Sequence, residues 1–245
     1  MSLLSLAWMA FAWMLGGFVH GVTSIGCSMV AMPLISFTVE PREAIVIACL
    51  AGGIVPLMLF AVYHRHLLRR ETLWLSLGCL PGIPAGTAML ASLPGRVLIL
   101  GMSVMLLFFV AWQMLSHRVR PALPYHPLVA FLVGLGCSFL AACTSLGGPV
   151  LAVYAAFRGW QKEAALATTS MTFNVLNAGI VLCQWKAGLY NDAVLDAVFV
   201  SLPAAMAGVL ISIPVVRHMP QELFRKLLLL MVLVSGITLL GRAVM

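Results

Sequence analysis

The sequence is 245 residues long, and 62% of its residues are hydrophobic while only 9% are charged. A soluble domain carries about 25% charged residues, so this composition excludes a soluble enzyme and a disordered chain. The net charge is +7, but the basic residues are too scattered to form a stripe that follows a phosphate backbone, and no nucleic-acid partner is expected. The mean hydropathy of +1.08 predicts an integral membrane protein in contact with the lipid bilayer.

Eight stretches without Asp, Glu, Lys or Arg define the candidate membrane segments. A helix needs about 20 apolar residues to cross the hydrocarbon, and six of the stretches have a length that suits one crossing. These six are residues 44–64, 72–95, 97–117, 164–185, 197–216 and 227–241. The other two, residues 1–39 and 121–157, are almost twice as long. Polar and small residues interrupt both near the middle, so each is predicted to be two helical pieces joined at a bend.

Three short patterns occur twice in the same order. Residues 23–26 (TSIG) match residues 144–147 (TSLG), at an offset of 121. Two further matches have nearly the same offset: residues 42–44 with 162–164, and Pro81-x4-Gly86 with Pro203-x4-Gly208. Constant spacing over half the chain predicts two repeats. We assign them to residues 1–116 and 126–245, joined by a polar linker at residues 117–125.

The basic residues distinguish two topologies. If both long stretches crossed once, the 14 Lys and Arg residues would divide equally between the two faces. If both double back, ten lie on one face and four on the other, as the positive-inside rule requires. Both termini then face away from the cytoplasm, and the linker is cytoplasmic. The predicted fold is all-α, with two inverted repeats of one broken or re-entrant hairpin plus three transmembrane helices, a common plan of secondary transporters.

The two interruptions supply the main candidate site residues. They are Thr23, Ser24, Ile25 and Gly26 in the first half, and Thr144, Ser145, Leu146 and Gly147 in the second. A hydroxyl in each is expected to cap the half-helix that follows. The free N–H groups at the two helix starts then carry partial positive charge toward the midplane and form a cradle for an oxyanion. The alternative is that these residues merely cap structural kinks.

Other polar residues at membrane depth extend this hypothesis. Asn174 and Asn177 lie on one face of the segment 164–185 and can donate to the same anion, or else join helices to each other. His20 can carry a proton, or be a neutral ring held by a backbone carbonyl. All seven carboxylates lie at or near segment ends, which favours an anionic or neutral cargo over a cation. No metal site or cofactor motif is present.

A set of short glycine- and proline-containing motifs occurs at residues 17–21 through Pro33, 42–44 and 80–86, with echoes in the second half. In these motifs the sequence resembles the sulfite exporter TauE/SafE family. It implies a bacterial inner-membrane permease, and family assignments include export of sulfite, sulfoacetate and related organosulfur anions.

The predicted function is a secondary transporter that exports a small sulfur-containing oxyanion by alternating access, and not an enzyme. One alternative is an anion channel without coupled motion. The other is a membrane-embedded redox enzyme, for which the sequence contains no CxxC, HExxH or GxSxG motif. A homodimer is an arrangement that the sequence leaves open.

Overall fold

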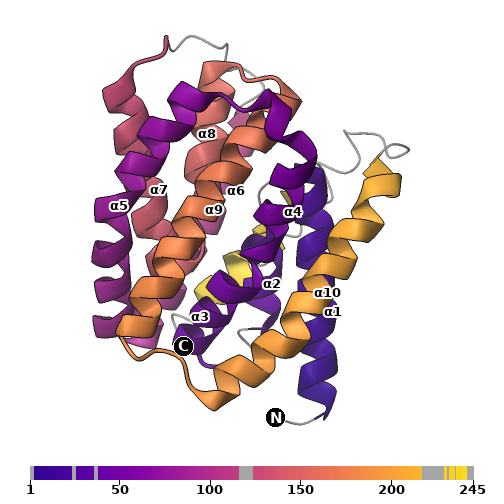
Figure 1. Ribbon diagram of the computed structural model, residues 1–245. Coiled ribbons are helices and arrows are strands. Elements are labelled where there is room, and N and C mark those ends of the chain that lie inside the picture. The colour runs from indigo at the N-terminus through magenta and orange to yellow at the C-terminus, as the bar shows by residue number, and fades with distance from the viewer. Residues whose placement is uncertain are drawn as a thin grey trace.

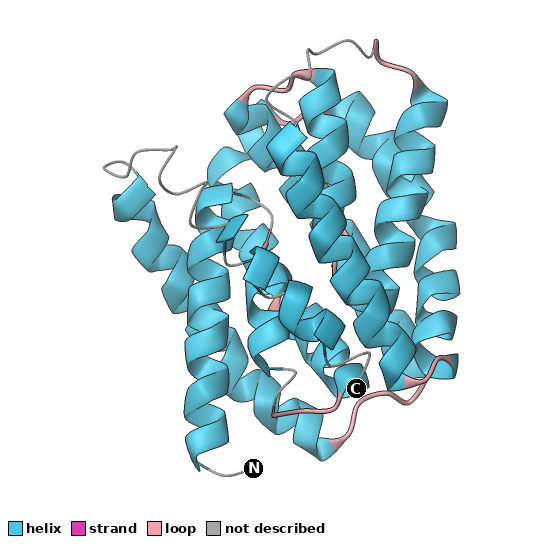
Figure 2. Ribbon diagram, turned by 180° about the vertical axis from the view of Figure 1, so that it is seen from behind, coloured by secondary structure: helices cyan, strands magenta, loops and turns pink. Residues whose placement is uncertain are grey.

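The computed structural model describes residues 3–23, 26–35, 38–115, 124–216, 229–230, 232–234 and 236–241. Over this part of the chain the regular structure is helical, without a strand, so the all-α prediction is confirmed (Figures 1 and 2). The elements are α1 (Leu3–Thr23), α2 (Cys27–Ile35), α3 (Pro41–Ala51), α4 (Ile54–Tyr63), η1 (His64–His66), α5 (Arg69–Ser92), α6 (Gly95–Leu115), α7 (Pro127–Thr144), α8 (Gly148–Arg158), α9 (Lys162–Lys186) and α10 (Asp192–Val216).

Six helical segments are long and apolar enough to cross a membrane. They are Pro41–His66, Arg69–Ser92, Gly95–Met114, Pro127–Thr144, Lys162–Lys186 and Asp192–Ser212. Helix α1 has 21 residues and no charged side chain, so its length also suits a crossing. Large apolar side chains on the outer surface are exposed, including Trp185 at 70% and Phe199 at 80%. Such a surface is stable in lipid and not in water, so the chain is a multi-pass membrane protein.

Both long charge-free stretches are broken, as predicted. The breaks separate α1 from α2 and α7 from α8. Helices α2 and α8 have nine and eleven residues, which at 1.5 Å per residue is about half of the hydrocarbon thickness. These short arms are half-helices, as expected for re-entrant hairpins.

Side-chain contacts show that each short arm returns along the helix before it. In the first hairpin, Trp8 Nε1 near the start of α1 donates to the Leu34 carbonyl near the end of α2, at 2.9 Å. In the second, Arg158 at the end of α8 lies over the ring of Tyr125, just before α7 begins, with 5.7 Å to the ring centroid. The chain therefore doubles back twice, which is the topology that the basic residues favoured. The linker residues 117–123 lie outside the described residues.

Two tightly packed helix pairs form the frame of the bundle. Helix α1 packs along α10, and α5 packs along α7. Glycine allows the backbones to touch: a Cβ atom at Gly17 would lie 2.2 Å from the Ala205 carbonyl oxygen, and one at Gly78 would lie 2.0 Å from that of Phe131. Small residues at such crossings are typical of membrane helices. Each pair combines one helix from residues 1–116 with one from residues 126–245, so the two predicted units interlock.

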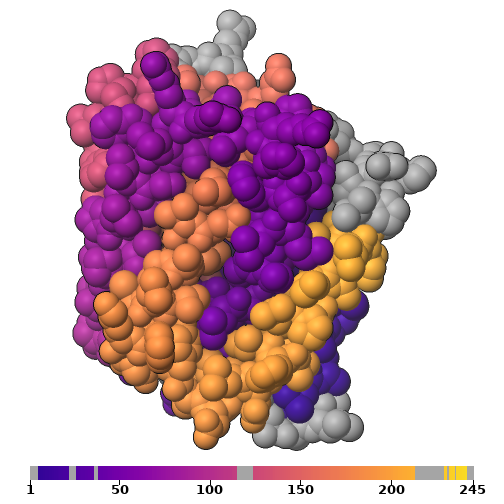
Figure 3. All heavy atoms as spheres, viewed as in Figure 1, coloured from indigo at the N-terminus to yellow at the C-terminus, as the bar shows by residue number. Residues whose placement is uncertain are grey.

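The segment 44–64 lies within one candidate span, Pro41–His66, as predicted, but its helix is interrupted. It is divided into α3 and α4 at Gly52 and Gly53, whose N–H groups donate to the carbonyls of Ala48 and Leu50. The second bond spans three residues, so the last turn of α3 is tightened. On the face seen in Figure 3, α9 lies between α5 and α4, and both pack against it. The break between α3 and α4 therefore lies close to α9 in the centre of the molecule.

Candidate functional site

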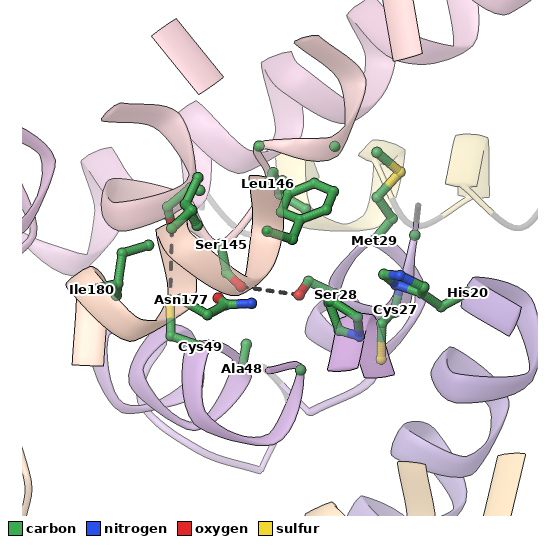
Figure 4. Close-up of a pocket in the computed structure, with 18 residues that line it drawn as sticks. His20, Cys27, Ser28, Met29, Ala48, Cys49, Ser145, Leu146, Asn177 and Ile180 are labelled. Carbon is green, nitrogen blue, oxygen red and sulfur yellow. Dashed lines mark hydrogen bonds between the residues drawn. The ribbon is translucent and has the colours of Figure 1, made fainter. Parts of the chain in front are cut away.

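A cavity lies where three interruptions of the helices meet, and it is closed on one side by α9. Its walls come from the break between α1 and α2, the break between α7 and α8, the end of α3 and the middle of α9 (Figure 4). It offers about 50 Å³ to the centres of water-sized molecules, several times the space that one buried water needs. Among the described residues, no Asp, Glu, Lys or Arg lines it.

The second break presents free N–H groups to this cavity. Ser145 ends α7 in the left-handed conformation with φ 61°, and Gly147 precedes the first turn of α8. The N–H groups of Leu146, Gly147 and Gly148 have no acceptor among the described residues. All three residues line the cavity together with Ser145. Because a left-handed serine is uncommon, its conformation fits a backbone held in place by its surroundings.

The prediction that a hydroxyl caps α8 is wrong. The residue in the capping position is Gly147, and no side chain caps this helix. The Thr144 hydroxyl donates to the Leu140 carbonyl within α7, at 2.8 Å, and Thr144 does not line the cavity. The Ser145 hydroxyl donates to the Ser28 hydroxyl at 3.0 Å. Since Ser145 is the C-cap of α7, its side chain leaves the hairpin and reaches the opposite break.

The first break approaches the cavity from the opposite side. Gly26 has φ 116°, a conformation that favours glycine, and precedes the first turn of α2. The N–H groups of Ser28 and Met29 have no acceptor among the described residues. Gly26, Ser28 and Met29 line the cavity. Thr23 is the last residue of α1, with a side chain that the structure does not describe, and Ser24 and Ile25 lie outside the described residues.

The two asparagines of α9 have different surroundings. Asn177 lines the cavity beside Gly53, where a Cβ atom would lie 3.7 Å from that of Asn177. Asn174 Nδ2 donates to the Pro56 carbonyl at 3.5 Å, and Asn174 is not part of the cavity wall. The structure therefore brings one predicted amide to the site and uses the other to join α9 to α4.

His20 lies in the cavity wall near the end of α1 and is only 6% exposed. Its Nδ1 atom accepts a hydrogen bond from the Cys27 N–H group at 3.4 Å. Its Nε2 atom is buried and has no partner among the described residues. The expectation of a ring held by a backbone carbonyl is therefore wrong, because the ring accepts from a backbone N–H group instead.

A family model described as sulfite exporter TauE/SafE matches residues 9–239. The chain belongs to the TauE/SafE family. The match covers nearly the whole chain and agrees with the sequence resemblance. Neither a curated protein nor a solved structure matches the chain. TauE/SafE proteins are a transporter family, and the fold with six candidate membrane spans is consistent with this class.

Sequence reasoning missed several wall residues of this TauE/SafE protein. Ser28, Cys27, Cys49 and Gly52 line the cavity but were not predicted to do so. A signal for Ser28 was present, because a hydroxyl in the first turn of a half-helix lies beside the free N–H groups. No comparable signal marked Cys49, whose position follows from the packing of α3 against α7 and α9.

Proposed function

We propose that this TauE/SafE protein is a secondary transporter that exports a small sulfur-containing oxyanion by alternating access. Sulfite, sulfoacetate and other organosulfonates are the cargo class. The observation that carries this proposal is the meeting of two half-helix starts at one cavity, linked by the hydrogen bond of 3.0 Å between Ser145 and Ser28. Each start contributes partial positive charge and N–H groups that have no acceptor among the described residues, which is the usual arrangement for oxyanion binding in proteins.

The cavity residues support an anion more than a cation. Its fixed donors are N–H groups of Ser28, Met29, Gly147 and Gly148. Asn177 adds an amide, and Ser145 and Ser28 add hydroxyls. A cation carrier usually places a carboxylate at membrane depth, and the described part of the wall contains none. A bound oxyanion would pair with N–H groups that have no acceptor among the described residues, which is a favourable exchange.

We further propose that the protein lies in the bacterial inner membrane with both termini in the periplasm. The end of α8, residues 64–70 and the linker then face the cytoplasm, where the excess of basic residues belongs. Reporter fusions that are active only in the periplasm test this at Met1 and Met245. Activity of a reporter fused in the 117–123 linker would contradict it.

Transport is tested with purified protein in liposomes. We expect sulfite efflux that saturates with concentration and responds to an imposed proton gradient. Ser145→Gly should weaken the flux, and Thr144→Val, which alters a hydroxyl outside the cavity, should not. Flux that rises linearly with sulfite and ignores the gradient would indicate a channel instead. No flux and no binding of sulfite or methanesulfonate would overturn the proposed cargo.

A further inference from the structure

His20 differs from the other donors of the cavity because its partner can be identified atom by atom. The Cys27 backbone N–H group can only donate, so the Nδ1 atom that faces it at 3.4 Å must be an acceptor. In a neutral imidazole the single ring hydrogen is then on Nε2. The contact at the start of α2 therefore fixes the tautomer of the ring.

The Nε2–H group produced in this way has no partner among the described residues. The atom is buried, and no acceptor among the described residues is within hydrogen-bond reach. An unpaired buried donor costs about 1–3 kcal/mol, and such groups are rare unless a ligand or water pairs with them. His20 is more than nine-tenths buried and extends from α1 toward the cavity in Figure 4. The ring that carries this donor therefore forms part of the cavity wall.

The repeat makes His20 an asymmetric feature. Adding the offset of 121 residues to position 20 gives Ala141, which lines the same cavity but carries no polar atom on its side chain. The two half-helix starts are similar to each other, since both offer backbone N–H groups. Because the imidazole is present on one side of the cavity and not on the other, it adds a third direction from which a donor reaches a ligand. A group with three oxygens can meet all three directions, while a single-atom anion offers one acceptor atom to all of them.

We propose that His20 is the specificity-determining residue of the cavity, and that its Nε2–H group donates to one oxygen of a bound sulfite or sulfonate group. The Cys27 N–H group is the positioning donor that holds the ring in the required tautomer. This inference rests on the proposed anion transport and adds the residue that recognises the –SO3 group. No bond is made or broken in this step.

Two isosteric variants separate recognition from a structural role. In His20→Gln the amide nitrogen occupies the place of Nε2, so the donor to the ligand remains and the acceptor for Cys27 is lost. In His20→Asn the amide oxygen can occupy the place of Nδ1, so the Cys27 bond remains and the donor to the ligand is lost. Recognition and structure therefore predict opposite orders of affinity for the two variants.

The measurement is calorimetric titration of the purified full-length protein with methanesulfonate and with sulfite, at about pH 8 where an ordinary imidazole is neutral. We expect the Kd of His20→Gln to rise by no more than about threefold and that of His20→Asn to rise by about 10- to 100-fold, the effect of one hydrogen bond to a charged group. Equal affinities, or weaker binding by His20→Gln than by His20→Asn, would overturn the assignment. Wild-type protein that binds neither probe would instead overturn the proposed function.

A second measurement does not depend on the folding of a variant. Nitrogen-15 spectra of the wild-type protein with labelled histidine report the tautomer of each ring. We expect His20 to show a protonated Nε2 whose signal moves when methanesulfonate is added. If the His20→Gln protein folds, the peak missing from its spectrum identifies the His20 signal. A hydrogen on Nδ1, or no change on addition of the anion, would contradict the proposal.

Discussion

The two re-entrant hairpins have the same plan but are fixed in different ways. Around the second break, the Cys137 thiol donates to the Gly147 carbonyl at 3.4 Å, and the far end of α8 is held by the ion pair between Arg158 and Glu71. In the first hairpin, His20 accepts from the Cys27 N–H group at the break, and the Trp8 indole holds the far end of α2 at Leu34. Both short arms are therefore held at both ends, but the far end of α8 is fixed by an ion pair and the far end of α2 by a single uncharged hydrogen bond. Only the first hairpin contributes an imidazole to the described part of the cavity wall.

The ion pair between Arg158 and Glu71 fixes the far end of α8 through several hydrogen bonds. Arg158 donates to Glu71 Oε1 from both Nε and Nη2, at 2.8 and 2.6 Å, and Tyr154 donates to Glu71 Oε2 at 2.6 Å. Both acceptor oxygens of the carboxylate are used, so the end of α8 is joined to the first turn of α5. At the position 121 residues before Arg158 the sequence has Phe37, which cannot form an ion pair.

The largest effect is expected from crowding the second break. A Cβ atom at Gly147 would lie 2.8 Å from the Ala141 Cβ atom and from the Cys137 carbonyl oxygen. Gly147→Val should therefore displace the start of α8 and weaken anion binding by more than about 100-fold, at a stability cost of about 1–3 kcal/mol. The matched control is Gly136→Val, because nothing lies within 4 Å of a Cβ atom there. Titration with sulfite measures both, and equal affinities would argue against a fixed second arm.

The second effect concerns stability. Glu71→Gln removes the negative charge from a carboxylate that is 7% exposed and faces an arginine that is 17% exposed. We expect a loss of about 2–3 kcal/mol of folding free energy, allowing for the partial exposure of Arg158. Thermal unfolding in detergent measures it. The control is Glu43→Gln, whose carboxylate accepts from Asn191 in an exposed contact and whose loss should cost less than about 0.5 kcal/mol.

A smaller effect tests the bridge between the two breaks. Ser145→Gly removes the hydroxyl that contacts Ser28 and keeps the positive φ accessible. The Kd for sulfite should rise by about tenfold, the lower range for a hydrogen bond to an anion. Thr144→Val is the matched control, since its hydroxyl bonds only within α7, and its Kd should stay within about twofold. A larger effect at Thr144 would reverse the assignment of the two hydroxyls.

The smallest effect concerns the first hairpin. Trp8→Phe removes the hydrogen bond from Nε1 to the Leu34 carbonyl. Because the donor is exposed, we expect a loss of about 0.5–1 kcal/mol, well below that of Glu71→Gln. Thermal unfolding of the Trp8→Phe and Glu71→Gln variants under the same conditions compares their two losses of folding free energy. A Trp8→Phe effect as large as that of Glu71→Gln would show that both hairpins are held equally.

The sequence was sufficient for the features that depend on length and charge. Charge-free stretches of double length predicted both breaks, and the ten-to-four division of basic residues predicted the doubled-back chain. Sequence reasoning failed where two neighbouring side chains carry the same functional group and only one of them reaches the cavity. Thr144 and Ser145 are neighbours with similar hydroxyls, and only the left-handed turn at Ser145 decides which one leaves the helix.

The same limit applies to α9 and to the α3–α4 segment. Asn174 and Asn177 share a helix face, but the position of α4 gives the first a carbonyl partner and leaves the second in the cavity wall. The division at Gly52 and Gly53 was not predicted, because a glycine pair within an apolar run fits a continuous membrane helix equally well. Contacts between segments that are distant in the sequence decide which asparagine reaches the cavity and where the helix is interrupted. Local sequence patterns do not contain this information.

The glycine crossings of α1 with α10 and of α5 with α7 limit how the molecule can rearrange. Backbones in direct contact cannot slide without steric overlap, so each crossing moves as a unit. Since each pair contains one helix from either side of the linker, the two units cannot separate by a hinge motion at the linker. The alternating-access cycle that we propose would instead be a relative tilt of these two pairs.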